Sequence, residues 1–142
     1  MDVIRRDTDY ALRLAAQLAQ RYNKTEPISA RGLADDTYVS YAIACKVLQK
    51  LAAAGLVKSV MGPKGGFLLA QPPDAITFAQ VIEAVQGPIS VIRCLVGDFD
   101  CPMKQTCPVG PKLKTMQHEI NDYLNTITLA EFLKSKGLEN ND

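Results

Sequence analysis

The amino-acid sequence predicts a mainly α-helical chain with one small β-hairpin. Apolar residues recur three and four positions apart through most of the first third of the chain, which is the period of amphipathic helices. Two short apolar stretches, Leu56–Val60 and Phe67–Ala70, then flank the turn-rich segment MGPKGG and are typical of a hairpin wing. Two short helices with a tight turn, followed by a hairpin, predict a winged helix-turn-helix. A long C-terminal helix is predicted beyond it.

Three helices are predicted before the hairpin. The first runs from Thr8 to Tyr22, with Thr8 as its N-cap. A short second helix begins after Ser29, and a longer third helix begins after Ser40, because serine hydroxyls cap helix N-termini. Gly55 stands where the third helix needs a left-handed C-terminal cap. The inward-facing residues of the third helix are predicted to be Ile43, Ala44, Val47, Leu48 and Leu51.

The second half of the chain is predicted to contain a capped helix, a loop and a long helix. Thr77 can cap a helix that Gly87 and Pro88 stop. Residues 88–110 hold three of the four cysteines and show no sustained period, so we expect a loop. A long helix opens at Pro111, and a final short helix, Leu129–Lys136, follows. The apolar residues of the long helix repeat as an a/d seam over two heptads, namely Leu113, Met116, Ile120, Tyr123 and Ile127.

Three units follow from this pattern. Residues 1–87 form the winged helix-turn-helix domain, residues 88–110 form a cysteine-rich loop, and residues 111–142 form the long helix with the short helix after it. Self-association through the a/d seam is expected, because such seams pair in coiled coils.

Composition and charge narrow the function. No apolar run approaches the ~20 residues of a membrane-spanning helix, and no secretory signal follows the start MDVIRRDTDY. We therefore expect a cytoplasmic protein whose four cysteines bind metal or act in redox chemistry rather than form disulfides. The net charge is +1, but residues 1–70 hold ten Lys and Arg against six Asp and Glu, whereas residues 71–142 hold six against nine. This asymmetry indicates that the first half meets a polyanion.

The predicted fold indicates which residues face double-stranded DNA. In a helix-turn-helix the second helix of the motif enters the major groove with its N-terminal residues against base edges. Lys46 and Lys50 can then reach phosphates, and Gln49 can read a base edge. Cys45 is interpreted as an incidental small residue at this surface, with a redox switch as the alternative. The predicted DNA-facing residues are Ser29, Ser40, Tyr41, Ala42, Cys45, Lys46, Gln49, Lys50, Lys64 and Gly65. The alternative is a polar helix face that is simply solvated.

Cys94, Cys101 and Cys107 are separated by six and five residues in the predicted loop. Structural zinc sites commonly use a closer cysteine pair, which is absent here. Iron–sulfur clusters accept wider spacings, because one loop can wrap several irons. Three thiolates leave one coordination position for another ligand, which suits a sensor better than an electron carrier. Free thiols, a disulfide pair and zinc remain the alternatives.

The quoted stretches also carry a family resemblance. Residues 8–13 (TDYALR), the segments LQKLAAAGLV, GPKGGFLLAQPP and ITFAQVIEAVQGP, and the three cysteines are similar to those of a bacterial winged-helix repressor family. This Rrf-two family includes the iron–sulfur regulator IscR, the nitric-oxide sensor NsrR, and RirA, and the chain resembles it over essentially its full length. The resemblance implies a homodimer that joins through the long helix and binds a roughly palindromic operator.

The resemblance also points to the fourth cluster ligand. IscR-like members place a histidine three residues after the last cysteine, but this chain has Gly110 there. The only histidine, His118, is expected at the surface or in the dimer interface. NsrR-like members use an N-terminal aspartate of the partner subunit, and Asp9 occupies the matching position, with a four-iron cluster favoured over a two-iron one. The alternatives to Asp9 are Asp7, Asp98 and Asp100.

A second departure concerns the wing. Many relatives carry an arginine just before its first glycine, suited to a narrow minor groove, and Met61 stands there instead. The expected function is a repressor, not an enzyme, whose operator affinity depends on an iron–sulfur cluster that senses iron, nitric oxide or redox state. The alternatives are a cluster-free thiol regulator of the same fold and a redox or electron-transfer protein.

Overall fold

The computed structural model describes residues 2–95 and 100–133 and confirms the predicted fold class. In chain order the elements are α1 (Arg6–Gln20), α2 (Ala30–Thr37), α3 (Tyr41–Ala53), β1 (Val57–Val60), β2 (Gly66–Leu69), the 3-10 turn η1 (Pro73–Ala75), α4 (Phe78–Gln86), the 3-10 turn η2 (Arg93–Leu95) and α5 (Gly110–Thr126). β1 and β2 pair antiparallel with Val57 opposite Leu69, and Ile28 adds a single bridge to Phe67. Within the described part of the chain, no helix is long and apolar enough to cross a membrane.

Three of the predicted helix caps are confirmed. The Ser29 hydroxyl accepts a hydrogen bond from the Gly32 N–H at 3.0 Å, and the Ser40 hydroxyl accepts one from the Ile43 N–H at 3.3 Å. Thr77 forms a capping box at the start of α4, in which its side chain and that of Gln80 satisfy each other's backbone N–H groups. Gly55 has the predicted left-handed conformation, with φ +79°.

The predicted start of the first helix is wrong. α1 begins at Arg6, and Thr8 is fully buried inside its first turn instead of capping it. The helix starts earlier because the segment before it is held against the end of α4, where the Arg5 N–H donates to Gln86 Oε1 at 3.0 Å. Acidic Asp7 in the first turn suits the positive end of the helix dipole. Contacts between residues about eighty positions apart therefore decide this boundary.

The predicted end of the first helix and one predicted inward-facing residue are wrong. α1 ends at Gln20 and not at the predicted Tyr22, which lies beyond the helix and is 39% exposed. Ile43 is 38% exposed because it lines an open hollow of about 230 Å³ between α1 and α3, next to Tyr10. The other predicted inward residues of α3 are buried.

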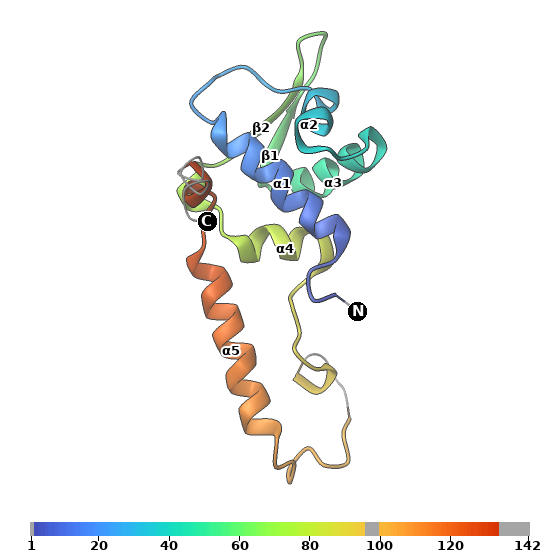
Figure 1. Cartoon of the computed structure of the whole chain (residues 1–142), viewed down its shortest axis with the longest axis vertical. Coiled ribbons are helices and arrows are strands. Elements are labelled where there is room, and N and C mark those ends of the chain that lie inside the picture. The colour runs from blue at the N-terminus through green and yellow to red at the C-terminus, as the bar shows by residue number, and fades with distance from the viewer. Residues whose placement is uncertain (1, 96–99, 134–142) are drawn as a thin grey trace, which may run out of the picture.

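The core lies among α1, α2, α3 and α4, and the wing strands close one end of it (Figure 1). Its largest fully buried side chains include Leu14, Leu33, Leu48 and Ile76. Leu129 returns to this core after α5, and its N–H donates to the Ile76 carbonyl at 3.0 Å. This return anchors the end of α5 to the winged-helix body. The predicted final helix begins as a 3-10 turn over residues 129–133, and its remainder lies outside the described residues.

The cysteine loop and α5 project away from the winged-helix body as a long excursion of the chain, which we call the loop–α5 hairpin to distinguish it from the β-hairpin of the wing (Figure 1). The loop descends from the end of α4, and α5 returns alongside it. Gln117 of α5 ties the two arms together, because its side chain accepts from the Val91 N–H at 2.7 Å and donates to the Ile89 carbonyl at 2.8 Å. The start of the loop is thus fixed to the middle of α5.

Candidate functional site

Most of the predicted DNA-facing residues are exposed, and they belong to the starts of α2 and α3, the length of α3 and the wing tip. Tyr41 and Ala42 are exposed in the first turn of α3, and Lys46 and Gln49 are exposed further along the helix. Cys45 and Lys50 are half-buried on the same helix. Ser29 and Ser40, which cap α2 and α3, keep exposed side chains at the two helix starts, and Lys64 is exposed at the wing tip. These residues bring helix starts, cations and hydrogen-bonding side chains to the exterior of the winged helix-turn-helix.

The turn between α2 and α3 adds an aromatic side chain that sequence reasoning missed. Tyr38 is 92% exposed and adopts the left-handed conformation, with φ +58°, at the C-terminus of α2. In this conformation its N–H reaches the Asp35 carbonyl, and the chain reverses toward α3. Residues other than glycine seldom adopt the left-handed conformation, so nothing in the sequence indicated that Tyr38 would form this turn.

The wing tip needs glycine for its own geometry. A Cβ at Gly65 would overlap the backbone carbonyl of Val60, and a Cβ at Gly66 would overlap the backbone of Ile28. The glycines thus permit the tight wing turn and its bridge to Ile28, independently of any contact with DNA. Met61, which stands where a minor-groove arginine was expected, is 90% exposed at this tip.

Electrostatic contacts at the start of α3 involve Tyr41. The neighbouring Cys45 thiol raises the pKa of Tyr41 above its ordinary value, and the cationic Arg31 lowers it by a smaller amount. Tyr41 is therefore a neutral hydroxyl at physiological pH. The Arg31 guanidinium lies over the Tyr41 ring, with its central carbon 4.3 Å from the ring centroid.

The three loop cysteines line a single pocket of about 500 Å³ at the far end of the loop–α5 hairpin. Cys94 is exposed in η2, whereas Cys101 and Cys107 are half-buried, and all three are free thiols. No three His, Cys, Asp or Glu side chains of the described residues gather closely enough to hold one metal ion. The three thiols therefore line one open pocket without converging on a single-ion site.

Two lysines and a glycine also line the pocket of the three cysteines. Lys104 and Lys114 line it and can offset the negative charge of thiolates. Gly110 begins α5 beside Cys107, and a Cβ there would stand 3.7 Å from the Cys107 sulfur, in ordinary contact. A side chain at position 110 would therefore start next to the thiols, and glycine leaves that space open. His118 is exposed on α5 and does not line the pocket.

Asp9 is not brought to the cysteines within one chain. It lies on α1 and pairs with Arg13 one turn later, with Oδ2 and a guanidinium nitrogen 2.7 Å apart. Asp7 accepts a hydrogen bond from the Thr8 N–H, and Asp100 is exposed but does not line the pocket. The remaining alternative, Asp98, lies outside the described residues.

The predicted apolar seam is partly uncovered in the single chain, with Leu113 and Ile120 half-buried. The predicted last seam residue is wrong, because α5 ends at Thr126 and Ile127 has an extended backbone. Met116 is 47% exposed and Tyr123 is 65% exposed, and no residue of α5 is buried. The seam differs from the side of α5 that faces α4, where Gln117, Asn121 and Leu124 line a hollow of about 250 Å³.

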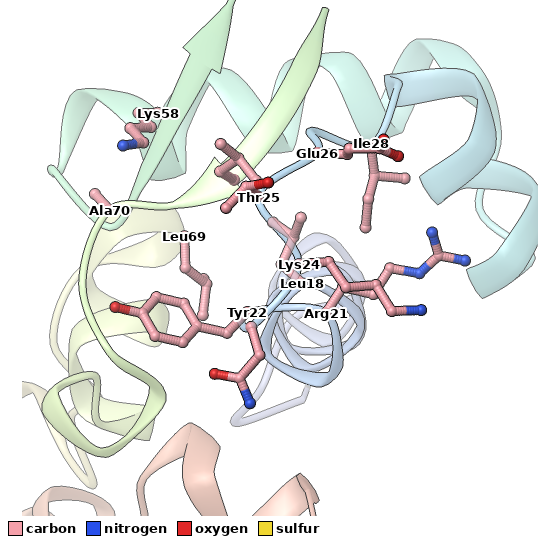
Figure 2. Close-up of a pocket in the computed structure, with 12 residues that line it drawn as sticks. Leu18, Arg21, Tyr22, Lys24, Thr25, Glu26, Ile28, Lys58, Leu69 and Ala70 are labelled. Atoms are coloured by element: carbon pink, nitrogen blue, oxygen red, sulfur yellow. The ribbon is translucent and has the colours of Figure 1, made fainter.

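A separate cavity of about 490 Å³ lies between the end of α1, the loop after it and the wing strands (Figure 2). Leu18 and Leu69 contribute apolar lining, whereas Arg21, Lys24 and Lys58 bring positive charge. Part of the basic excess of the first seventy residues thus lies here and not on α3. None of the predicted site residues lines this cavity.

Comparisons with known proteins agree with this architecture. The sequence model of the Rrf2 family, described as an iron-dependent transcriptional regulator, matches residues 4–135. A putative HTH-type transcriptional regulator of Haemophilus influenzae is 32% identical over 113 residues, which cover 80% of this chain and 75% of the relative.

Two solved structures extend the likeness. CymR (YrzC), the global cysteine regulator of B. subtilis, superposes with a TM-score of 0.76 at 28% identity, covering 94% of this chain and 98% of CymR. IscR of T. potens superposes with a TM-score of 0.73 at 27% identity, covering 94% of this chain and 87% of that one. The chain therefore belongs to the Rrf2 family of helix-turn-helix, DNA-binding transcriptional regulators.

Proposed function

We propose that this regulator binds a roughly palindromic operator as a homodimer, and that its operator affinity depends on an iron–sulfur cluster held by Cys94, Cys101 and Cys107. The observation that carries the proposal is that these three cysteines, from separate parts of one loop, line the same pocket. A bound cluster supplies a group whose integrity and charge respond to iron supply, nitric oxide and redox state. The family model, described as iron-dependent, supports the same reading.

The fourth ligand is proposed to be Asp9 of the partner subunit. Gly110 leaves the space beside Cys107 open, so the pocket can admit a ligand from outside the chain. The Asp9 carboxylate is 47% exposed on α1 and is thus accessible to a second copy. Binding would require it to leave or share its ion pair with Arg13, which costs little at an exposed site. Because position 110 is glycine and not histidine, a four-iron cluster is proposed over a two-iron one.

The contacts around the loop suggest how a change at the pocket reaches DNA. Gln117 holds the start of the loop to α5, which carries the proposed dimer seam. At the same end of α4, Gln86 bonds the segment before α1, because it accepts from the Arg5 N–H and donates to the Val3 carbonyl. A rearranged loop would therefore shift both the dimer helix and the start of α1. In a dimer this would change the separation of the two α3 helices, which must match half-sites about 34–36 Å apart.

The cluster proposal is tested on protein purified without oxygen. We expect a visible absorption band, with iron and acid-labile sulfide in comparable amounts, and native mass spectrometry to give the cluster type. Cys101→Ser should lose the cluster, and Asp9→Ala should make it more labile. Cys45→Ser is the matched control, since Cys45 lies on α3 away from the pocket, and it should keep the cluster content of the wild type. Wild-type protein without iron or sulfide would reject the proposal.

A second candidate is a cluster-free regulator in which the same cysteines respond directly to oxidants or thiols. Two observations favour it. The three cysteines are free thiols with two lysines in their pocket, and the chain is similar in structure to a global cysteine regulator. The candidate predicts iron-free protein whose operator affinity changes on treatment with a thiol oxidant and recovers on reduction. That recovery without any iron separates it from the cluster proposal.

A further inference from the structure

A contact between the two helices of the helix-turn-helix involves an arginine outside the predicted DNA-facing set. Arg31 lies in the first turn of α2, two residues after the cap Ser29. It reaches the first turn of α3, where its guanidinium carbon lies 4.3 Å from the centroid of the Tyr41 ring. Both side chains are exposed. The contact therefore joins the two helix starts on the surface proposed to face DNA.

The geometry is that of a stacked cation–π contact, which is effective within about 6 Å of a ring centroid. A guanidinium can stack on a ring with its flat face and still offer N–H donors at its edge, which a lysine ammonium cannot do. The face of the Tyr41 ring is thus covered by Arg31.

Arg31 also keeps its charge for an external partner. Two ion pairs are found among the described residues, Arg5 with Asp7 and Arg13 with Asp9, and Arg31 belongs to neither. An exposed arginine in the first turn of α2 lies beside N–H groups at the positive end of a helix dipole, which repel a cation and attract an anion. Its location is therefore explained better by an external anion than by helix stability.

We propose that Arg31 is a further DNA-binding residue, which contacts a backbone phosphate beside α3 and positions the Tyr41 ring for the major groove. The inference rests on the proposed DNA-facing surface of α3. As a phosphate contact Arg31 contributes to affinity on any sequence. As a positioning residue it contributes to the preference for the operator, because it fixes the side chain at the first turn of the recognition helix.

The test measures binding of full-length protein to an operator selected from random duplexes and to a scrambled duplex, over a series of salt concentrations. Arg31→Gln should lower the magnitude of the salt slope by about one per chain, the value of one lost phosphate contact. It should also lower the operator-to-scrambled affinity ratio by roughly 2- to 5-fold per chain, the factor for an exposed cation–π contact. Arg31→Lys should keep the salt slope, because the positive charge remains. It should still lower the operator-to-scrambled affinity ratio, because a lysine ammonium lacks the planar group that stacks on the Tyr41 ring.

Two further variants isolate the inference. Arg21→Gln removes one arginine at the cavity beside the wing (Figure 2) and should change neither the slope nor the ratio. Lys46→Gln, on the proposed surface itself, should lower the slope. An unchanged slope in Arg31→Gln overturns the phosphate contact, and an unchanged ratio overturns the positioning role. If Lys46→Gln also has no effect, the proposed surface is wrong, whereas an effect of Lys46→Gln alone rejects only the role of Arg31. Equal melting temperatures of the variants exclude unfolding as the cause.

Discussion

The apolar seam of α5 allows a quantitative prediction, because its exposure in one chain limits what a dimer can bury. Met116 is 47% exposed, so a partner helix can cover at most about half of its surface. Full burial of a methionine side chain stabilises by about 1.5–3 kcal/mol, so the covered half is worth roughly 0.7–1.5 kcal/mol per chain. A twofold interface contains the side chain twice, which doubles the contribution to roughly 1.5–3 kcal/mol.

We therefore expect Met116→Ala to raise the dissociation constant of the dimer by roughly 10- to 100-fold, since about 1.4 kcal/mol is a factor of ten. Sedimentation velocity over a concentration series of labelled protein measures this constant. Asp122→Ala is the matched control, because Asp122 is an exposed residue of the same helix outside the seam, and it should leave the constant unchanged. A Met116→Ala protein that dimerises as tightly as the control would refute the reasoning, as would a wild-type chain that stays monomeric.

Two other predictions concern α4 and the cysteine pocket. Thr77→Ala removes the N-cap of α4 and should lower the free energy of unfolding by about 1 kcal/mol, seen as a fall of several degrees in thermal melts. Thr25→Ala, in an exposed loop, is its control, and equal melting temperatures for the two variants would contradict the role of the cap. Gly110→His should place an imidazole beside the thiols as a fourth ligand and slow the loss of the visible band in air. Gly110→Ala is the control for added bulk, because its Cβ makes only ordinary contacts. If the visible band decays equally fast in the two variants, the imidazole does not act as a ligand at this position.

Local signals in the sequence predicted the parts of the fold that depend on neighbouring residues. Ser29, Ser40 and Thr77 cap the expected helices because the hydroxyl and the N–H that it accepts from are three residues apart. The start of α1 was predicted two residues late, at Thr8. The segment before α1 is held by Gln86, which lies far along the chain. No local pattern contains that information.

The candidate site also has features that the sequence predicted and features that only the structure shows. The cysteine spacing indicated a polynuclear group, but only the structure shows that the three thiols share one pocket with Lys104 and Lys114. Arg31 was missed because its contact with Tyr41 depends on how α2 and α3 pack, not on spacing within either helix. Asp9 and the α5 seam remain predictions, since both require a second copy of the chain.

The central claim is that the cluster held by the three loop cysteines controls operator affinity. The most direct measurement is an anaerobic titration of one operator duplex with cluster-loaded protein and with the same protein after the cluster is removed. We predict affinities that differ by roughly 5- to 150-fold, the range of typical allosteric couplings. A variant with serine at Cys94, Cys101 and Cys107 should bind alike before and after reconstitution. Equal affinities of the loaded and cluster-free wild-type protein would contradict the claim.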